Sequence, residues 1–159
     1  MGFDPDAGWP GDATQADLSA YAPLTALADY ALTAALADYV PKSENIAGVG
    51  AIFDTPTAGD VLIVPVPFAC TITKVTMLGN LSGSAVVDIW KDTYANHPPT
   101  VADTITAAAK PTISAATKSQ DATLTGWTTA IAAGDILVFK VDSASTITKL
   151  TVMLDVLRT

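Results

Sequence analysis

An 18-residue segment that occurs twice constrains the fold of this chain more than any other feature. The segment GDVLIVPVPFACTITKVT at 59–76 aligns without gaps with GDILVFKVDSASTITKLT at 134–151, and ten of the eighteen positions are identical. Each copy has the pattern of a turn, a strand, a short turn and a second strand, because Gly-Asp opens a turn and β-branched residues follow it. Two such units at corresponding places predict a β-sandwich with approximate internal symmetry.

The rest of the chain after residue 45 has the same character. Thr and Val become frequent and turn signals recur, which predicts an all-β domain over 46–159. In the closing segment Thr148, Leu150, Val152, Leu154 and Val156 alternate and are expected to share one face of a strand. The Pro-containing region 92–114 fits an excursion between the sheets. The expected strands are 47–53, 60–66, 70–78, 84–91, 121–127, 135–141 and 146–157.

A second repeat, nine residues long, occupies 14–45. Ala and Leu dominate this region and favour helix. Nine residues turn a helix through about 900°, so successive repeats face opposite sides, and both apolar sides need cover. We therefore expect a short Ala/Leu-rich helical stalk that associates with other copies of the chain as a homotrimer. The repeated positions expected to form this trimer stalk are Leu18, Tyr21, Leu27, Tyr30, Leu36 and Tyr39.

The first 13 residues differ from both later regions. They are rich in Asp, Pro and Gly, which favour turns and extended chain. Phe3 and Trp9 are large apolar side chains in this polar setting. One interpretation is a disordered terminus. The other is an extended anchor peptide that docks through these two aromatic residues, because buried aromatic residues carry much binding energy.

The composition excludes several classes of protein. Half of the residues are hydrophobic, 15% are charged and the mean hydropathy is +0.38, so the chain either buries most of its surface or shares it with partner chains. A net charge of −8 with a single Arg argues against nucleic acid as a partner. Asp29 and Asp38 interrupt the richest apolar run, so no stretch reaches the roughly 18 apolar residues of a membrane span. Cys70 is alone, which excludes an internal disulfide framework.

No group of residues assembles catalytic chemistry, so we expect neither an enzyme nor a cofactor. His97 has no Cys or His nearby for a typical zinc site and no evident nucleophile partner. The glycines are scattered and form neither a phosphate loop nor a dinucleotide fingerprint. Asp88 and Asp92 are four residues apart on an expected strand and should share a face. They either hold a cation or are solvated.

Aromatic residues supply the candidates for sugar binding. Trp90, Tyr94 and Trp127 are able to stack on a sugar ring, although such residues more often belong to a core or an interface, the role that we favour for Trp90. The residues retained as candidate glycan contacts are Tyr94, His97 and Trp127.

The chain from 46 to 159 resembles a domain family of phage and prophage virion proteins. The residues that carry the resemblance are SAVVDIWKDTYANHPPTVADTIT (84–106), KPTIS (110–114), LTGWTTAIAAGDIL (124–137) and the closing STITKLTVMLDV (145–156). The N-terminal Ala/Leu/Tyr repeats also resemble those of phage fibre shafts. The resemblance implies a jelly-roll-like β-sandwich knob, a homotrimer, and a place in capsid fibres, decoration proteins or tail-fibre tips. It supplies no catalytic residue, and knobs of this kind often contact host-surface glycans.

Together these features predict a virion structural protein, assembled in the host cytoplasm, with three parts. Residues 1–13 dock on capsid or baseplate proteins, residues 14–45 form the trimeric stalk, and residues 46–159 form a mainly β knob. The short chain favours a capsid spike, head fibre or decoration protein. The alternatives are the receptor-binding tip of a tail fibre and a carbohydrate-binding module.

Overall fold

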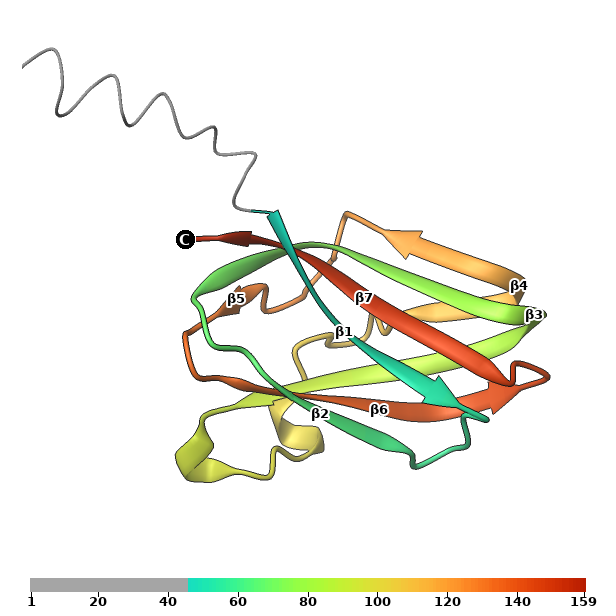
Figure 1. The fold of residues 1–159 in the computed structure, drawn as a ribbon, viewed down its shortest axis with the longest axis horizontal. Helices are drawn as coiled ribbons and strands as arrows, with labels where there is room; N and C mark the ends of the chain where they lie inside the picture. Colours follow the sequence, from blue (N-terminus) through green and yellow to red (C-terminus); the bar gives the residue numbers. More distant parts are fainter. Residues whose placement is uncertain (1–45) are drawn as a thin grey trace, which may run out of the picture. The chain divides into compact units, whose positions relative to one another are not determined.

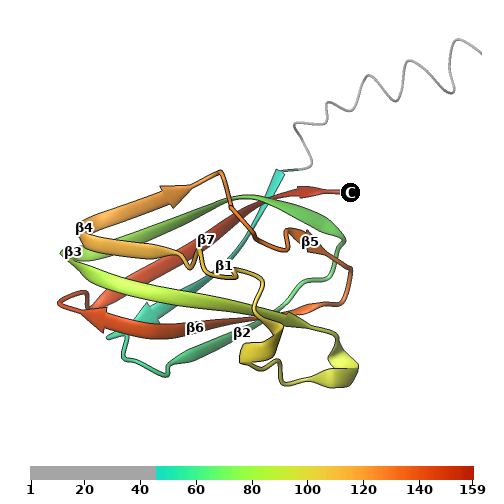
Figure 2. The same ribbon diagram turned by 180° about the vertical axis from the view of Figure 1, so that it is seen from behind.

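The computed structural model describes residues 46–159, and its fold is mainly β (Figures 1 and 2). One seven-stranded sheet has the order β1-β7-β3-β6-β2, and β4 and β5 also pair with β3. The elements are β1 (Ile46–Asp54), β2 (Val61–Pro65), β3 (Cys70–Asp92), η2 (Tyr94–Asn96), η3 (Val101–Asp103), β4 (Thr112–Asp121), β5 (Ala130–Ile131), β6 (Ile136–Ser145) and β7 (Lys149–Arg158). The expectations for the anchor peptide and the stalk, including Phe3, Trp9 and the repeated Leu and Tyr residues, lie outside the described residues.

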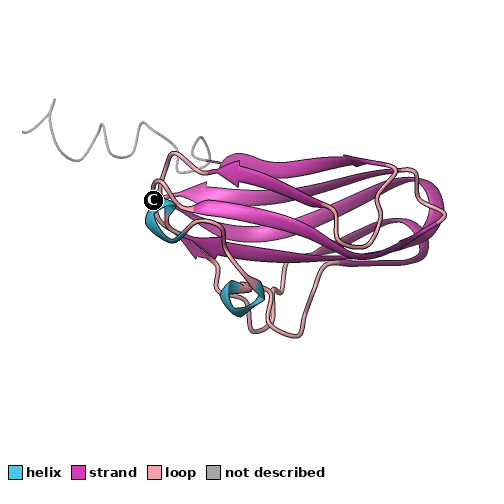
Figure 3. Cartoon of the chain, turned by 90° about the horizontal axis from the view of Figure 1, so that it is seen from below, coloured by secondary structure: helices cyan, strands magenta, loops and turns pink. Residues whose placement is uncertain are grey.

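The sheet folds back on itself because β3 turns near its middle. Residues 70–79 of β3 pair with β7, whereas residues 84–92 pair with β6. Figure 1 shows β3 running to one end of the domain and returning, and Figure 3 shows the strands stacked in layers. Gly83 lies at the turn, where a Cβ would overlap the backbone oxygen of Ser145. The outermost strands, β1 and β2, contact each other, so the folded sheet is nearly closed.

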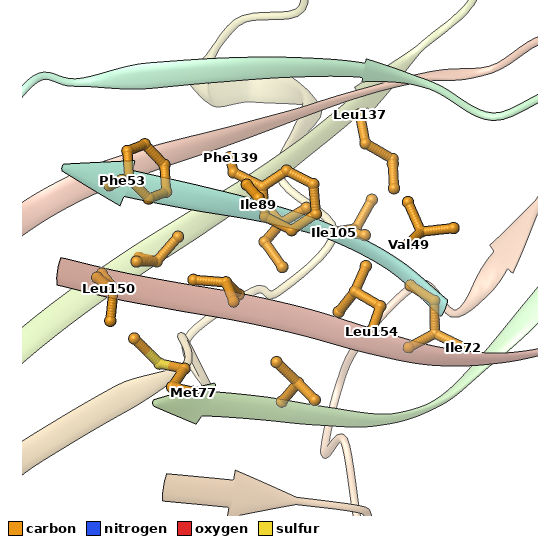
Figure 4. Close-up of a cluster of buried hydrophobic side chains, with 14 of the residues drawn as sticks. Val49, Phe53, Ile72, Met77, Ile89, Ile105, Leu137, Phe139, Leu150 and Leu154 are labelled. Carbon is orange, nitrogen blue, oxygen red and sulfur yellow. The ribbon is translucent and has the colours of Figure 1, made fainter. Parts of the chain in front are cut away.

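The core fills the space between the two layers (Figure 4). The alternation expected for the closing strand is confirmed from Leu150 to Val156, whose inward side chains are at most 1% exposed, while Thr148 lies in the turn before β7. The opposite layer contributes Ile89 and Phe139, both fully buried. The inward sets of β1 and β7 are Val49, Ala51, Phe53, Leu150, Val152, Leu154 and Val156.

The internal symmetry predicted from the 18-residue repeat is present in the strand pairing. The repeats are 75 residues apart in sequence, and β2 and β6 pair antiparallel with Ile63 opposite its own equivalent, Val138. The second strands of the repeats also pair with each other, with Met77 opposite its equivalent, Val152. Equivalent strands therefore meet across one approximate two-fold axis.

The Gly-Asp turns obey the same symmetry. Gly59 and Gly134 have φ of 100° and 88°, values that favour glycine. Asp60 Oδ2 accepts a hydrogen bond from the Thr57 N–H at 2.7 Å, and Asp135 Oδ2 accepts one from the Ala132 N–H at 2.8 Å. The turn predicted at each Gly-Asp pair is confirmed, and in both turns Gly has a positive φ and Asp binds a backbone amide.

The strand predictions are partly wrong. The segments 70–78 and 84–91 are the two halves of the single strand β3. The segment 121–127 is not a strand: Leu124 and Gly126 have φ of 49° and 77°, and the Asp121 carboxylate accepts the N–H of Thr123, as in a turn.

The excursion expected over 92–114 is shorter than predicted, because β4 starts at Thr112. Before that point the chain runs along the second half of β3, where Thr104 bridges to Trp90 and the Ile105 N–H donates to the Ile89 oxygen at 2.9 Å.

Candidate functional site

The predicted glycan contacts lie in two different loops. Tyr94 is 83% exposed and His97 is also exposed, and both belong to the loop that follows β3. Asp92 shapes this loop, because its Oδ1 accepts hydrogen bonds from the Thr93 N–H and the Asn96 amide. Trp127 is half-buried on another loop, packs against the core and donates its indole N–H to the Ala109 oxygen. The structure therefore brings Tyr94 and His97 together and gives Trp127 an evident packing role.

A buried carboxylate, Asp88, holds this part of the chain against the sheet. It is 1% exposed, and its Oδ1 accepts hydrogen bonds from Thr104 Oγ1 at 2.6 Å and Thr106 Oγ1 at 2.8 Å. Its Oδ2 lies 3.0 Å from Lys110 Nζ. The expectation that Asp88 is solvated, or holds a cation with Asp92, is wrong, because Asp88 is enclosed and paired with a lysine.

The ion pairs continue from Asp88 across the outer side of β6. Lys110 Nζ lies 2.7 Å from Asp142 Oδ2, and Lys140 Nζ lies 2.7 Å from Asp142 Oδ1. The Lys140 ammonium also lies 5.7 Å from the centre of the Trp90 ring, a cation–π distance. We call Asp88, Lys110, Lys140 and Asp142 the charged cluster. Its two carboxylates and two ammonium groups give it no net charge. It joins β3, β6 and the segment before β4.

The protonation states of the charged cluster favour a structural role. Burial raises the pKa of Asp88, but hydrogen bonds from Thr104, Lys110 and Thr106 outweigh it and lower the pKa below its usual value. Burial likewise raises the pKa of Asp142, and its bonds to Lys110 and Lys140 lower it overall. Hydrogen bonds to Asp142 and Asp88 raise the pKa of Lys110. These groups stay charged near pH 7, whereas a general acid or base works best with a pKa near that pH.

The Trp90 indole is the one unsatisfied group beside this cluster. Its Nε1 is buried and has no hydrogen-bond partner among the described residues. The N–H lies near enough to Asp88 to lower the pKa of that carboxyl, yet it is outside hydrogen-bond geometry. Trp90 is half-buried, which agrees with the core or interface role favoured from the sequence.

The outer side of the other layer is a second candidate surface. We call it the β1–β7 face and define it by the outward residues of β1, β7, the first half of β3 and the end of β4. Sequence patterns did not identify it, because its apolar residues come from three separate segments. Its residues are Gly48, Gly50, Ile52, Asp54, Thr71, Lys74, Thr76, Leu78, Lys118, Gln120, Lys149, Thr151, Met153, Asp155 and Leu157.

A shallow depression of about 370 Å³ lies at one end of the β1–β7 face. Its walls include Thr73, at a bulge of β3, and Ala122, after β4. Lys74 and Asp155 form an ion pair within it, and the Thr73 hydroxyl donates to the Asp155 backbone oxygen. The two charges satisfy each other, so the depression presents no free charged group to a ligand.

The two ends of the domain differ in what they carry. Ile46, where the described chain begins, pairs with Leu157 near the C-terminus, and both lie at one end (Figure 1). The loop with Tyr94 follows Asp92, which pairs with Ile136 at the start of β6 and lies at this same end. The opposite end carries the turns 55–60, 79–83 and 146–148, and β4 also bends there near Ala115.

No family model matches the chain, and no curated protein matches it. Within residues 46–159, no cluster of three His, Cys, Asp or Glu residues could hold a metal ion. Over the same residues, no helix is both long and apolar enough to cross a membrane.

Proposed function

We propose that the chain is a phage virion structural protein: a trimeric capsid spike, head fibre or decoration protein whose N-terminus docks on the particle. Residues 46–159 form its outward knob, which we assign to the jelly-roll type. The observation that carries the proposal is the position of Ile46. The β domain begins directly after the nonapeptide repeats and is attached at one end, as a knob on a stalk must be.

The free end of the domain suits an exposed tip. Its three turns are tied together by Asn80, whose Oδ1 accepts hydrogen bonds from the N–H groups of Thr148 and Lys149. The Thr55 N–H donates to the Thr148 oxygen at 2.7 Å and adds the third turn to this network. In an outward-facing knob these turns are farthest from the particle. Host-surface glycan contact through Tyr94 and His97 would then occur on the particle-proximal side.

Two other functions fit the same domain. The receptor-binding tip of a tail fibre needs the same stalk and knob, and only the particle proteins that receive Phe3 and Trp9 differ. A carbohydrate-binding module needs no particle at all. Immunogold labelling of virions distinguishes head from tail, and a glycan array with the intact protein tests the third function.

The proposal is tested by the mass of the protein and by its incorporation into particles. Light scattering should give about three times the chain mass of 16.3 kDa. The double variant Phe3→Ala, Trp9→Ala should remain a trimer with unchanged melting but should no longer co-sediment with virions. A monomer at micromolar concentration would refute the trimer, and full incorporation of the double variant would refute the anchor.

A further inference from the structure

The β1–β7 face carries more exposed apolar surface than a solvated sheet needs. Ile52 is 67% exposed, Leu78 49% and Met153 38%. An antiparallel sheet with one face on the core normally alternates apolar residues inward with polar residues outward. The outward positions of β1 before Asp54 instead hold glycines and Ile52. The face therefore places exposed apolar side chains from β1, the first half of β3 and β7 among its polar residues.

Two glycines keep the β1–β7 face flat. The Met153 side chain lies across Gly48 and Gly50: a Cβ at either position would come within 3.0–3.1 Å of its sulfur. A Cβ at Gly50 would also press against the backbone oxygen of Val152. A flat surface with a flexible methionine can fit closely against another protein surface.

Both carboxylates of the β1–β7 face are paired with lysines, and Lys118 is the one charged side chain of this face outside the ion pairs of the described residues. Its two acids, Asp54 and Asp155, each pair with a lysine of the same face, Lys149 at 2.9 Å and Lys74 respectively. The whole chain has a net charge of −8, yet this face holds no unpaired carboxylate. Two copies can therefore meet here without repulsion between unpaired carboxylates, the repulsion that a chain of this net charge would otherwise meet.

We propose that the β1–β7 face packs against neighbouring copies of this chain, so that the three knobs contact one another around the axis of the trimer. The inference rests on the trimeric stalk of the proposed function. Residue 45 ends the stalk region and Ile46 begins β1. One residue of extended chain spans at most about 3.6 Å, so in the proposed trimer the start of β1 follows directly on the end of the stalk.

The test introduces a charge into this face of the full-length protein. Ile52→Arg should weaken trimer association at least tenfold, measured by sedimentation equilibrium, because an arginine at a packed apolar contact must be desolvated. Ile63→Arg is the matched control. Ile63 is 50% exposed on β2, in the other layer, and this variant should associate as the wild type does.

Methionine oxidation supplies a second measurement that does not depend on comparing affinities. Met153 should react with hydrogen peroxide at least tenfold more slowly in the wild-type trimer than in the dissociated Ile52→Arg protein. Met77, which is 1% exposed, should stay protected in both and shows that the variant is folded.

The outcomes separate this inference from the proposed function. A wild-type trimer whose association is unchanged by Ile52→Arg overturns the inference and leaves the stalk intact. Equal weakening by both arginine variants, or equally fast oxidation of Met153 in trimer and variant, also overturns it. A monomeric wild type refutes the proposed trimer itself.

Discussion

Asp88 is a buried carboxylate whose negative charge is stabilised by its neighbours. It is enclosed, and its carboxylate receives two threonine hydroxyls and faces the Lys110 ammonium. Asp88→Asn keeps an acceptor for the hydroxyls but removes one of the two ionic partners of Lys110, the other being Asp142. We expect a loss of about 1–3 kcal/mol in the free energy of unfolding, measured by urea denaturation at pH 7. Asp92→Asn, a change at a more exposed position, is the control and should shift the midpoint much less.

The pH dependence of the same variant follows from the lowered pKa of Asp88. The carboxyl titrates near 3.9 in the unfolded chain and below that value in the folded one. The stabilisation is therefore complete above about pH 4 and is lost as the pH falls through the folded pKa. The difference between the wild type and Asp88→Asn should be constant from pH 5 to 8 and shrink below pH 4. A difference that persists unchanged at pH 2 would show that folding does not lower the pKa of this carboxyl.

At the scale of elements, the two Gly-Asp turns should respond alike. No atom lies within 4 Å of a Cβ built at Gly59 or Gly134, so substitution there tests the backbone alone. Alanine at a positive φ costs about 1–2 kcal/mol. Gly59→Ala and Gly134→Ala should each lower the unfolding free energy by that amount in urea titrations. A loss at one turn without a comparable loss at the other would contradict their equivalence.

The turn within β3 should tolerate far less change. A Cβ at Gly83 overlaps the Ser145 backbone oxygen, whereas one at Gly79 comes no nearer than 3.1 Å to the Ile147 side chain and 3.3 Å to the Leu81 backbone oxygen. Gly83→Ala should destabilise by up to about 3 kcal/mol, because backbone atoms must move, and Gly79→Ala by less than about 1 kcal/mol. Differential scanning calorimetry of the two proteins measures the contrast. Equal melting temperatures would show that a side chain at Gly83 fits without moving the backbone.

Strands were predictable from the sequence where apolar and polar residues alternate regularly. The strand β7 was predictable because its buried residues alternate without a break from Leu150 to Val156. The strand β4 was missed because it is peripheral and Ile113 is its only buried residue, while Ala115 at φ 46° breaks its period. A sheet edge of this kind leaves no periodic apolar signal.

The candidate sites were less predictable than the strands. The charged cluster joins residues up to 54 positions apart, from Asp88 to Asp142. No motif with a fixed spacing in the sequence predicts contacts between residues so far apart. The outward apolar residues of the β1–β7 face became visible only once register assigned Ile52 and Met153 to the same side. The 18-residue repeat, in contrast, gave the internal symmetry directly.

At the scale of the whole molecule, the nonapeptide leucines are expected to hold the trimer together. On the expected helix Leu27 and Leu36 would face opposite sides, so both would be buried only if several chains surrounded the stalk. A packed Leu→Ala change costs about 2–5 kcal/mol per chain. The double variant Leu27→Ala, Leu36→Ala should dissociate or melt at a lower temperature, measured by light scattering and circular dichroism. Unchanged mass and melting would refute a stalk role for these residues.

The pairing of each repeat with its own equivalent also sets a problem for folding. Strand β2 finds its partner only after 75 further residues have been made, and closing so long a loop makes non-local β folds slow. During that delay β2 can meet the equivalent strand of a neighbouring chain. That strand offers the same hydrogen-bonding edge, in the same register, as the correct partner. Chains held close together, as in the proposed trimer, can then exchange strands. Recovery of correctly paired protein should therefore fall as the concentration during refolding rises.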